Sequence, residues 1–380
     1  MVGSTGTVVA VYRSLADMPP ATLALFRDSV GTEAPGGLTW HRLLAQDAMS
    51  LGQQTLFYVV SAGGPDGRPL AVLPMRMTAP SRRSFRPRGP QTLATMWTTR
   101  CHPLLADSVE DPAPLLRALI AAIVAEPECD GIKLEPLARE EPIFDYLLDA
   151  CRQAGLVVQT FFSFSNWYLE VGGRSADEFF ADLPPRLGHT ISQKTRRLAA
   201  SGRSRIQVFT GGDGVEEAIA DCERVYRTGW QSAERYQGFL PGLMRACANQ
   251  GWLRLGLLYV DEEPGAVQFW IVPGRSALVF SQAYDERFAK LSLGTVLMAH
   301  MMRRAIDVDR VEVVDCLQGD DAYKREWMSH RRERWGILAM NPRTTRGVLG
   351  ILRHVVGRFV KRALLAPLRL LRRLARRLRG

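Results

Sequence analysis

Apolar residues recur along the chain in two patterns, one with a helical period and one typical of buried strands. Apolar positions three and four residues apart predict helices, and short apolar runs bounded by turn residues predict strands. In the first half, the predicted helices are Ala21–Ser29, Leu38–Met49, Pro112–Ala125 and Pro142–Ala154. The predicted strands of that half are Thr55–Val60, Leu70–Met77 and Ile132–Leu134.

The second half repeats this order of elements. The predicted helices are Arg186–Ser201, Val215–Thr228, Phe239–Asn249, Thr295–Asp307 and Ala322–Met328. The predicted strands are Leu253–Val260, Ala266–Val272, Ala277–Ala283, Val311–Val314 and Trp335–Ala339. Equivalent strands start roughly 200 residues apart, which indicates one supersecondary pattern used twice.

A chain of 380 residues is long enough for two domains of ordinary size. We therefore expect one domain over residues 1–162, a second over residues 163–343 and a separate tail over residues 344–380. The segment Ser163–Leu183 is expected to join the two halves.

Positive charge is concentrated in the tail. The chain has a net charge of +10, yet residues 344–380 hold 11 Lys and Arg and no Asp or Glu, so the rest is near neutral. This distribution argues against a nucleic-acid-binding domain. Apolar and basic residues alternate at helical spacing in the tail, which predicts amphipathic helices that attach the protein to an anionic membrane surface. A solvated or nucleic-acid-binding tail is the alternative.

Together with the basic tail, the N-terminal sequence, the lengths of the apolar runs and the cysteines predict a cytoplasmic protein attached peripherally to the inner membrane face. The N-terminal residues show no secretory signal, and no apolar run is long enough to span a bilayer. The six cysteines are scattered and form no CxxC pair, so we expect reduced thiols, no disulfide framework and no metal site.

A turn with one glycine joins the strand Ala277–Ala283 to the helix that follows it. Free N–H groups in the first turn of a helix bind anions, and glycine lets a phosphate approach the backbone closely. The candidate phosphate site consists of Ser292, Leu293, Gly294, Thr295 and Val296. For the turn alone, an ordinary helix start is the alternative interpretation.

A second motif follows the strand Val311–Val314. Its first part is the strand end Asp315-x-x-x-Gly319-Asp320, and its second part is Tyr323-Lys324-x-x-Trp327 at the start of a helix. A carboxylate, a phenol and an ammonium group close to a candidate phosphate site are the groups that acyl transfer needs.

The two motifs and the basic helix that contains Gln193–Leu198 together resemble the GNAT superfamily of acetyltransferases. The arrangement looks like the branch found with cellulose and exopolysaccharide biosynthesis genes, which is related to the Fem-type aminoacyltransferases. The resemblance covers about residues 163–340, whereas the first half matches only in element order.

The resemblance implies an α/β (α+β) fold of two tandem GNAT-like domains, each a mixed twisted sheet flanked by helices. Two central strands would separate and admit the thioester arm of acetyl-CoA or another acyl-CoA, with the pyrophosphate on the turn Leu293–Val296. The chain departs from the superfamily at this turn. Leu291 stands where Arg or Gln is usual, and Gly294 is the one glycine in the turn.

The resemblance also suggests catalytic roles. Asp315 would act as a general base, Tyr323 would protonate the leaving thiolate, and Lys324 would stabilise developing negative charge. Each has a structural alternative: Asp315 capping a turn or pairing with Lys324, Tyr323 packing in the core, and Lys324 lying solvated on its helix.

The function expected is that of an N-acetyltransferase or other acyltransferase. It would move an acyl group from acyl-CoA to an amine or hydroxyl of a small molecule or glycan, as a polysaccharide or cell-envelope precursor. One alternative is a Fem-type transferase that uses aminoacyl-tRNA. The other is a catalytically silent scaffold associated with a polysaccharide synthase.

Overall fold

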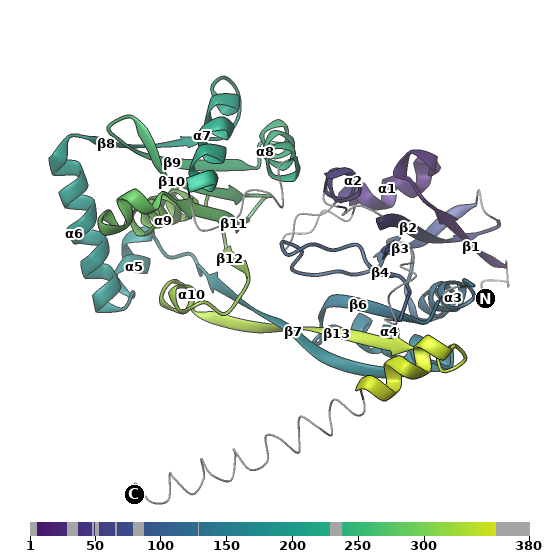
Figure 1. The fold of residues 1–380 in the computed structure, drawn as a ribbon. Coiled ribbons are helices and arrows are strands. Elements are labelled where there is room, and N and C mark those ends of the chain that lie inside the picture. The colour runs from purple at the N-terminus through teal and green to yellow at the C-terminus, as the bar shows by residue number, and fades with distance from the viewer. Residues whose placement is uncertain are drawn as a thin grey trace, which may run out of the picture.

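The structure is a computed structural model that describes residues 6–28, 37–47, 49, 53–64, 67–78, 87–127, 129–228 and 238–354. Its helices flank one large twisted sheet that runs through both halves of the molecule (Figure 1). Thirteen strands of the described residues join in the order β1-β2-β3-β4-β6-β13-β7-β12-β11-β10-β9-β8, and β5 pairs with β3.

The first half contributes the strands β1 (Thr7–Tyr12), β2 (Gln53–Ala62), β3 (Arg68–Thr78), β4 (Gln91–Thr92), β5 (Leu104–Leu105), β6 (Gly131–Ala138) and β7 (Val157–Glu170). Its helices are η1 (Leu15–Asp17), α1 (Pro20–Asp28), α2 (Gly37–Asp47), α3 (Ala113–Val124) and α4 (Pro142–Gln153). Proline in the first turn starts α3 and α4 at the predicted places, since proline needs no N–H partner there.

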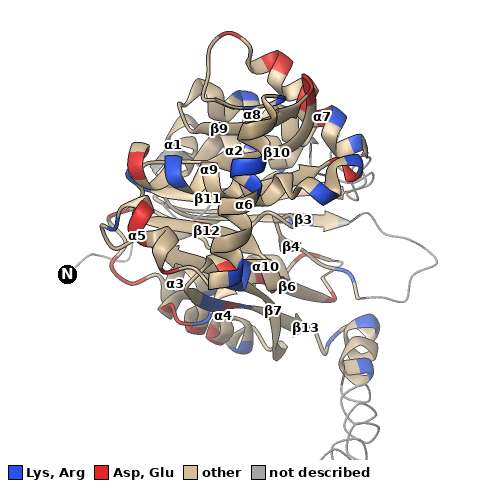
Figure 2. Ribbon diagram, turned by 90° about the vertical axis from the view of Figure 1, so that its left-hand side faces the viewer, with Lys and Arg blue, Asp and Glu red and all other residues tan. Residues whose placement is uncertain are grey.

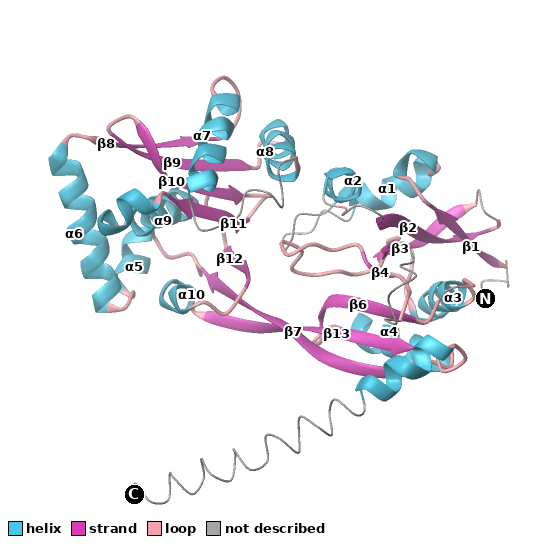
Figure 3. Ribbon diagram, in the orientation of Figure 1, coloured by secondary structure: helices cyan, strands magenta, loops and turns pink. Residues whose placement is uncertain are grey.

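The second half contributes the strands β8 (Ser204–Phe209), β9 (Leu253–Val260), β10 (Glu263–Ile271), β11 (Ser276–Tyr284), β12 (Val313–Gln318) and β13 (His330–Met340). Its helices are α5 (Ala176–Ala181), α6 (Pro185–Ser201), α7 (Val215–Thr228), α8 (Phe239–Asn249), η3 (Glu286–Leu291), α9 (Leu293–Arg303), η4 (Arg304–Val308) and α10 (Ala322–Trp327). A last helix covers residues 345–354 (Figure 3).

The two halves repeat one pattern down to an irregularity in the sheet. β6 carries one extra residue between Leu134 and Leu137 where it pairs with β13. β12 carries one extra residue at the same place, between Asp315 and Gln318, where it pairs with β7. A β-bulge inserts one residue into one strand of a pair and alters its course, so this shared defect marks equivalent positions. The repeat predicted from element order is therefore confirmed.

The last strand of each half completes the sheet of the other half. β13, from the end of the second half, lies between β6 and β7 of the first half. β7, from the end of the first half, pairs with β12 of the second half through Val313, Val314, Asp315 and Gln318. β7 and β13 also pair with each other antiparallel along most of their length.

Five strands were not predicted from the sequence: β1, β7, β8 and the two-residue strands β4 and β5. The segment expected to join the halves at Ser163 begins inside β7. The boundary proposed between residues 162 and 163 therefore falls within a strand shared by the two halves. β7 has no clean alternation, because its centre from Phe164 to Asn166 is buried on both faces of the sheet.

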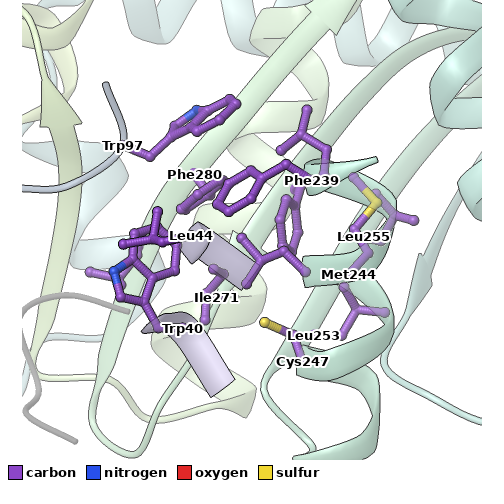
Figure 4. Close-up of a cluster of buried hydrophobic side chains, with 14 of the residues drawn as sticks. Trp40, Leu44, Trp97, Phe239, Met244, Cys247, Leu253, Leu255, Ile271 and Phe280 are labelled. Atoms are coloured by element: carbon purple, nitrogen blue, oxygen red, sulfur yellow. The ribbon is translucent and has the colours of Figure 1, made fainter. Parts of the chain in front are cut away.

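An aromatic cluster joins the two halves (Figure 4). Trp97 lies in the loop between β4 and β5, and its ring stacks on Phe239 of α8 at 5.1 Å and on Phe280 of β11 at 5.4 Å. Trp40 of α2 meets the edges of the same two rings at 5.6 and 6.2 Å. Offset aromatic pairs add to the free energy of ordinary apolar burial.

Trp97→Ala should lower the free energy of unfolding by about 3–5 kcal/mol, because the change leaves a cavity between the halves. Chemical denaturation measures it. The control is Tyr146→Ala, an aromatic on α4 with 38% of its surface exposed, which should change stability by no more than about 0.5 kcal/mol. Equal effects of the two changes would show that the cluster does not hold the halves together.

Candidate active site

β11 and β12 run parallel and then separate. They pair over Ser276–Leu278 and Val313–Asp315, after which β11 continues to Tyr284 without further pairing to β12. The carboxyl ends of both strands lie at the same edge of the sheet because the strands are parallel. The unpaired end of β11 leads through Glu286–Leu291 into the turn before α9, and Tyr284 at that end lies beside Gly294.

The turn at the start of α9 presents its backbone. Ser292 is in the left-handed conformation with φ 57°, and its carbonyl accepts the N–H groups of Thr295 and Val296 at 3.1 and 3.2 Å. Helix geometry leaves the N–H groups of Leu293 and Gly294 without an acceptor inside the helix. A side chain at Gly294 would point into open space, with its nearest neighbour, Cδ1 of Tyr284, at 3.9 Å from the Cβ position.

The five residues of the predicted phosphate site divide into two groups. Ser292, Gly294 and Thr295 are half-buried, whereas Leu293 and Val296 are almost fully buried in the core beneath α9. Leu293 and Val296 therefore fix the turn through their side chains. A ligand would meet the backbone of the turn and the side chains of Ser292 and Thr295.

Two neighbours support this turn. The buried amide of Gln268 on β10 donates through Nε2 to the carbonyl of Gly294 at 3.3 Å and accepts from Trp270 Nε1 at 2.9 Å. On the outer side, Nζ of Lys194 on α6 donates to the carbonyl of Lys290 at 2.7 Å. The positive charge of Lys194 thus lies at the carbonyl of Lys290, two residues before Ser292 in the sequence.

The outer face of α6 is basic. Arg186, Arg196 and Arg197 are exposed, and the helix contains no acidic residue (Figure 2). The ammonium of Lys194 on α6 adds its charge to the positive end of the α9 dipole. An anion at the turn would therefore be stabilised by both helices.

Asp315 lies at the centre of a buried polar network. Its carboxylate accepts hydrogen bonds from Asn166 Nδ2 at 2.6 Å, from the backbone N–H of Leu317 at 2.7 Å and from Arg332 NH2 at 2.5 Å. Nε of Arg332 also donates to Oδ1 of Asn166 at 2.5 Å. The side chain of Asp315 is 2% exposed, and its charge is balanced by Arg332.

The residues of this network come from three different strands. Asp315 is on β12, Asn166 is on β7 and Arg332 is on β13. The guanidinium of Arg332 also lies 4.6 Å from the ring centre of Tyr168, which stacks on His330 at 5.2 Å. The partner of Asp315 is therefore Arg332 and not Lys324, the pairing that the sequence suggested as an alternative.

Lys324 is buried and points at the end of β12. Its Nζ donates to the carbonyls of Cys316 at 2.8 Å and Gln318 at 2.5 Å, and it lies 3.7 Å from Oδ2 of Asp321. These carbonyls belong to the bulge, where Leu317 has a φ of 53°. The ammonium therefore fixes an irregular backbone, and Lys324 is not the solvated residue that the sequence suggested as an alternative.

Tyr323 and Trp327 share the inward face of α10 with the core beneath them. Burial raises the pKa of the Tyr323 phenol well above its usual range. Burial also raises the pKa of the nearby Cys316 thiol to about 12, although the charge of Lys324 opposes this shift. Both groups are thus protonated at neutral pH, and the Cys316 thiol is a poor nucleophile.

The structure brings Asp315, Tyr323 and Lys324 together around the end of β12. It shows that Asp315 and Lys324 are engaged by other groups, and their catalytic roles remain predictions. The sequence did not reveal Asn166, Arg332 or Gln268. Asn166 and Arg332 are placed by the unpredicted pairing of β7 with β13, and Gln268 is a single polar residue within an apolar strand.

The comparisons with known proteins agree with a fold in which two parallel strands separate beside the start of a helix. Residues 186–325 match the family described as an acetyltransferase (GNAT) domain. The crystal structure of FemX resembles the chain with a TM-score of 0.53 at 11% identity, over 83% of this chain and 94% of that chain. A tandem GNAT protein from the clavulanic acid biosynthesis pathway has a TM-score of 0.51 at 11% identity, over 88% and 100%.

A third similar structure is the C-terminal domain of a putative lysylphosphatidylglycerol synthetase from Agrobacterium fabrum. Its TM-score is 0.52 at 11% identity, over 88% of this chain and 95% of that chain. No curated protein matches the sequence significantly. A segment of the second half thus matches a GNAT domain, and the whole chain has a fold similar to that of a tandem GNAT protein.

Arg332→Met should lower the free energy of unfolding by about 3–5 kcal/mol, because it leaves the Asp315 charge buried without its partner. The double variant Asp315→Leu, Arg332→Met removes both charges and should recover a large part of that loss. A double-mutant cycle by chemical denaturation measures the coupling. Strictly additive losses would mean that the ion pair contributes nothing to the junction of the three strands.

Proposed function

We propose that the protein transfers an acyl group from acyl-CoA to an amine or hydroxyl. One observation carries the proposal: β11 and β12 separate beside a helix start whose backbone is open at Gly294. Phosphates of a donor fit this turn, because its free N–H groups and the nearby Lys194 supply hydrogen bonds and positive charge. Acetyl-CoA and longer acyl-CoAs share the pyrophosphate that these groups would hold.

The residues of the site would bind and orient the donor. The N–H groups of Leu293 and Gly294 and the hydroxyls of Ser292 and Thr295 would hold the phosphates, and Gln268 keeps the turn in place from below. The thioester arm would then lie in the opening between β11 and β12. Holding the two reactants in line is itself a large part of catalysis in a group transfer.

The proposed acceptor is a glycan or small-molecule precursor of a polysaccharide or of the cell envelope, and the proposed partner is a polysaccharide synthase. Support comes from the sequence resemblance to domains found with exopolysaccharide biosynthesis genes. The second candidate is transfer from aminoacyl-tRNA. The exposed arginines of α6 favour it, since a basic helix face beside the donor turn can follow a nucleic-acid backbone.

Gly294→Trp should abolish the thermal stabilisation by acetyl-CoA, because the indole would occupy the space in front of the turn. Thermal shift with a series of acyl-CoA concentrations measures the loss. The control is Gly188→Trp on α6, since Gly188 is also a half-buried helical glycine with open space at its Cβ position. If Gly294→Trp binds acetyl-CoA as tightly as the parent, the turn is structural.

Thermal shift of the unmodified protein with each donor distinguishes the three candidate functions. Stabilisation by acyl-CoA supports the proposed function. Stabilisation by aminoacyl-tRNA alone supports the second candidate, and a response to neither donor supports a silent scaffold.

Lys324→Met separates a catalytic from a structural role for this lysine. Its contacts lead us to expect a loss of about 1–3 kcal/mol in the free energy of unfolding for each carbonyl left without a donor. The control is Arg325→Met, which removes an exposed charge from the same helix. A catalytic lysine would instead lower kcat by about 10²–10³ with unchanged stability, so both quantities are measured on each variant.

A further inference from the structure

The helix over residues 345–354 packs on the protein through glycine. Gly347 and Gly350 are buried on the side that faces the body. A Cβ atom at Gly350 would lie 2.7 Å from Cγ of Pro87 and 3.2 Å from Sδ of Met340. The helix thus lies too close to the body for any larger side chain on this side.

The opposite side of the helix is apolar and exposed. Val348, Leu349 and Leu352 have 39%, 45% and 52% of their surface exposed. In a soluble protein, the apolar stripe of a surface helix faces the core. Here the stripe faces away from the protein, and a cluster of large apolar side chains in that position marks a docking surface.

The charge around this face indicates what it meets. Arg346 and Arg353 belong to the same helix, and residues 344–380 hold 11 Lys and Arg and no acidic residue. Apolar residues continue at helical spacing beyond the described helix, at Val355, Val356, Phe359 and Val360. The structures of residues 355–380, and so of most of the tail predicted above, lie outside the described residues.

We propose that Val348, Leu349 and Leu352 insert into the surface of an anionic lipid bilayer. Apolar side chains beside arginines, with no carboxylate among them, match the boundary between acyl chains and anionic headgroups. No helix in the described part of the chain is long and apolar enough to cross a bilayer.

A second copy of the chain fits this face less well. A symmetric dimer places the same patch of each copy against the other. Two segments with only positive charges would then lie together, and their repulsion would oppose the apolar contact. Anionic lipid supplies the opposite charge, which is why the proposal commits to it.

Vesicle flotation of the full-length protein tests the proposal without any assay of acyl transfer, so its outcome is independent of the proposed function. The parent should float with vesicles that contain about 30% phosphatidylglycerol in phosphatidylcholine, and not with phosphatidylcholine alone. Raising NaCl from about 100 to about 500 mM should reduce binding at least tenfold. The triple variant Val348→Gln, Leu349→Gln, Leu352→Gln should also bind at least tenfold more weakly.

The matched control is Val8→Gln, Val157→Gln, Val308→Gln, three apolar residues with 38%, 47% and 63% of their surface exposed elsewhere. It should float like the parent. The proposal is overturned if the triple variant at the helix floats like the parent, or if the parent floats equally with neutral vesicles. It is also overturned if the parent does not float and light scattering shows a dimer that the triple variant disrupts.

Discussion

The antiparallel pairing of β7 with β13 is the constraint on which both halves depend. Each of these strands completes a sheet whose other strands come from the other half, and the Arg332–Asp315–Asn166 network ties them to β12. Removal of either strand would leave a sheet edge exposed in each half. The irregular end of β12, where Lys324 is bound, therefore depends on residues of the first half. The segment that matches the GNAT domain, residues 186–325, contains neither β7 nor β13. It therefore lacks β7, the strand that pairs antiparallel with β12.

Features carried by contiguous residues were predictable from the sequence, and features made by distant pairing were not. The helices α7 and α8 and the turn before α9 follow local patterns, so their places were predicted correctly. The role of that turn as a phosphate site stays a prediction. β7 pairs with β13 across more than 150 residues of sequence, and nothing local signals such a pairing. Asp315 and Lys324 were singled out by residue type and local spacing, whereas Asn166 and Arg332, the distant partners of Asp315, were not.

Both halves contain a β-bulge at equivalent positions, and the residues beside the two bulges differ in chemistry. Leu134 pairs with Ile337 beside the bulge of β6, and Asp315 pairs with Tyr168 beside the bulge of β12. The two strands follow the same course, but the residue beside the bulge is apolar in the first half and a buried carboxylate in the second. The first half instead contributes Trp97, which reaches the bulged residue Phe280 of β11. The buried carboxylate beside the bulge therefore belongs to the second half, although Asn166 of β7 in the first half donates to it.

The exchange of strands also has a consequence for synthesis on the ribosome. β13 belongs between β6 and β7, yet its residues emerge after almost all the others. The first half cannot complete its sheet while the second half is being made, although domains usually fold in the order in which they are translated. Until residue 340 has left the exit tunnel, β6 and β7 each keep an unpaired edge that can template aggregation. Completion of the continuous sheet must therefore wait for the arrival of β13.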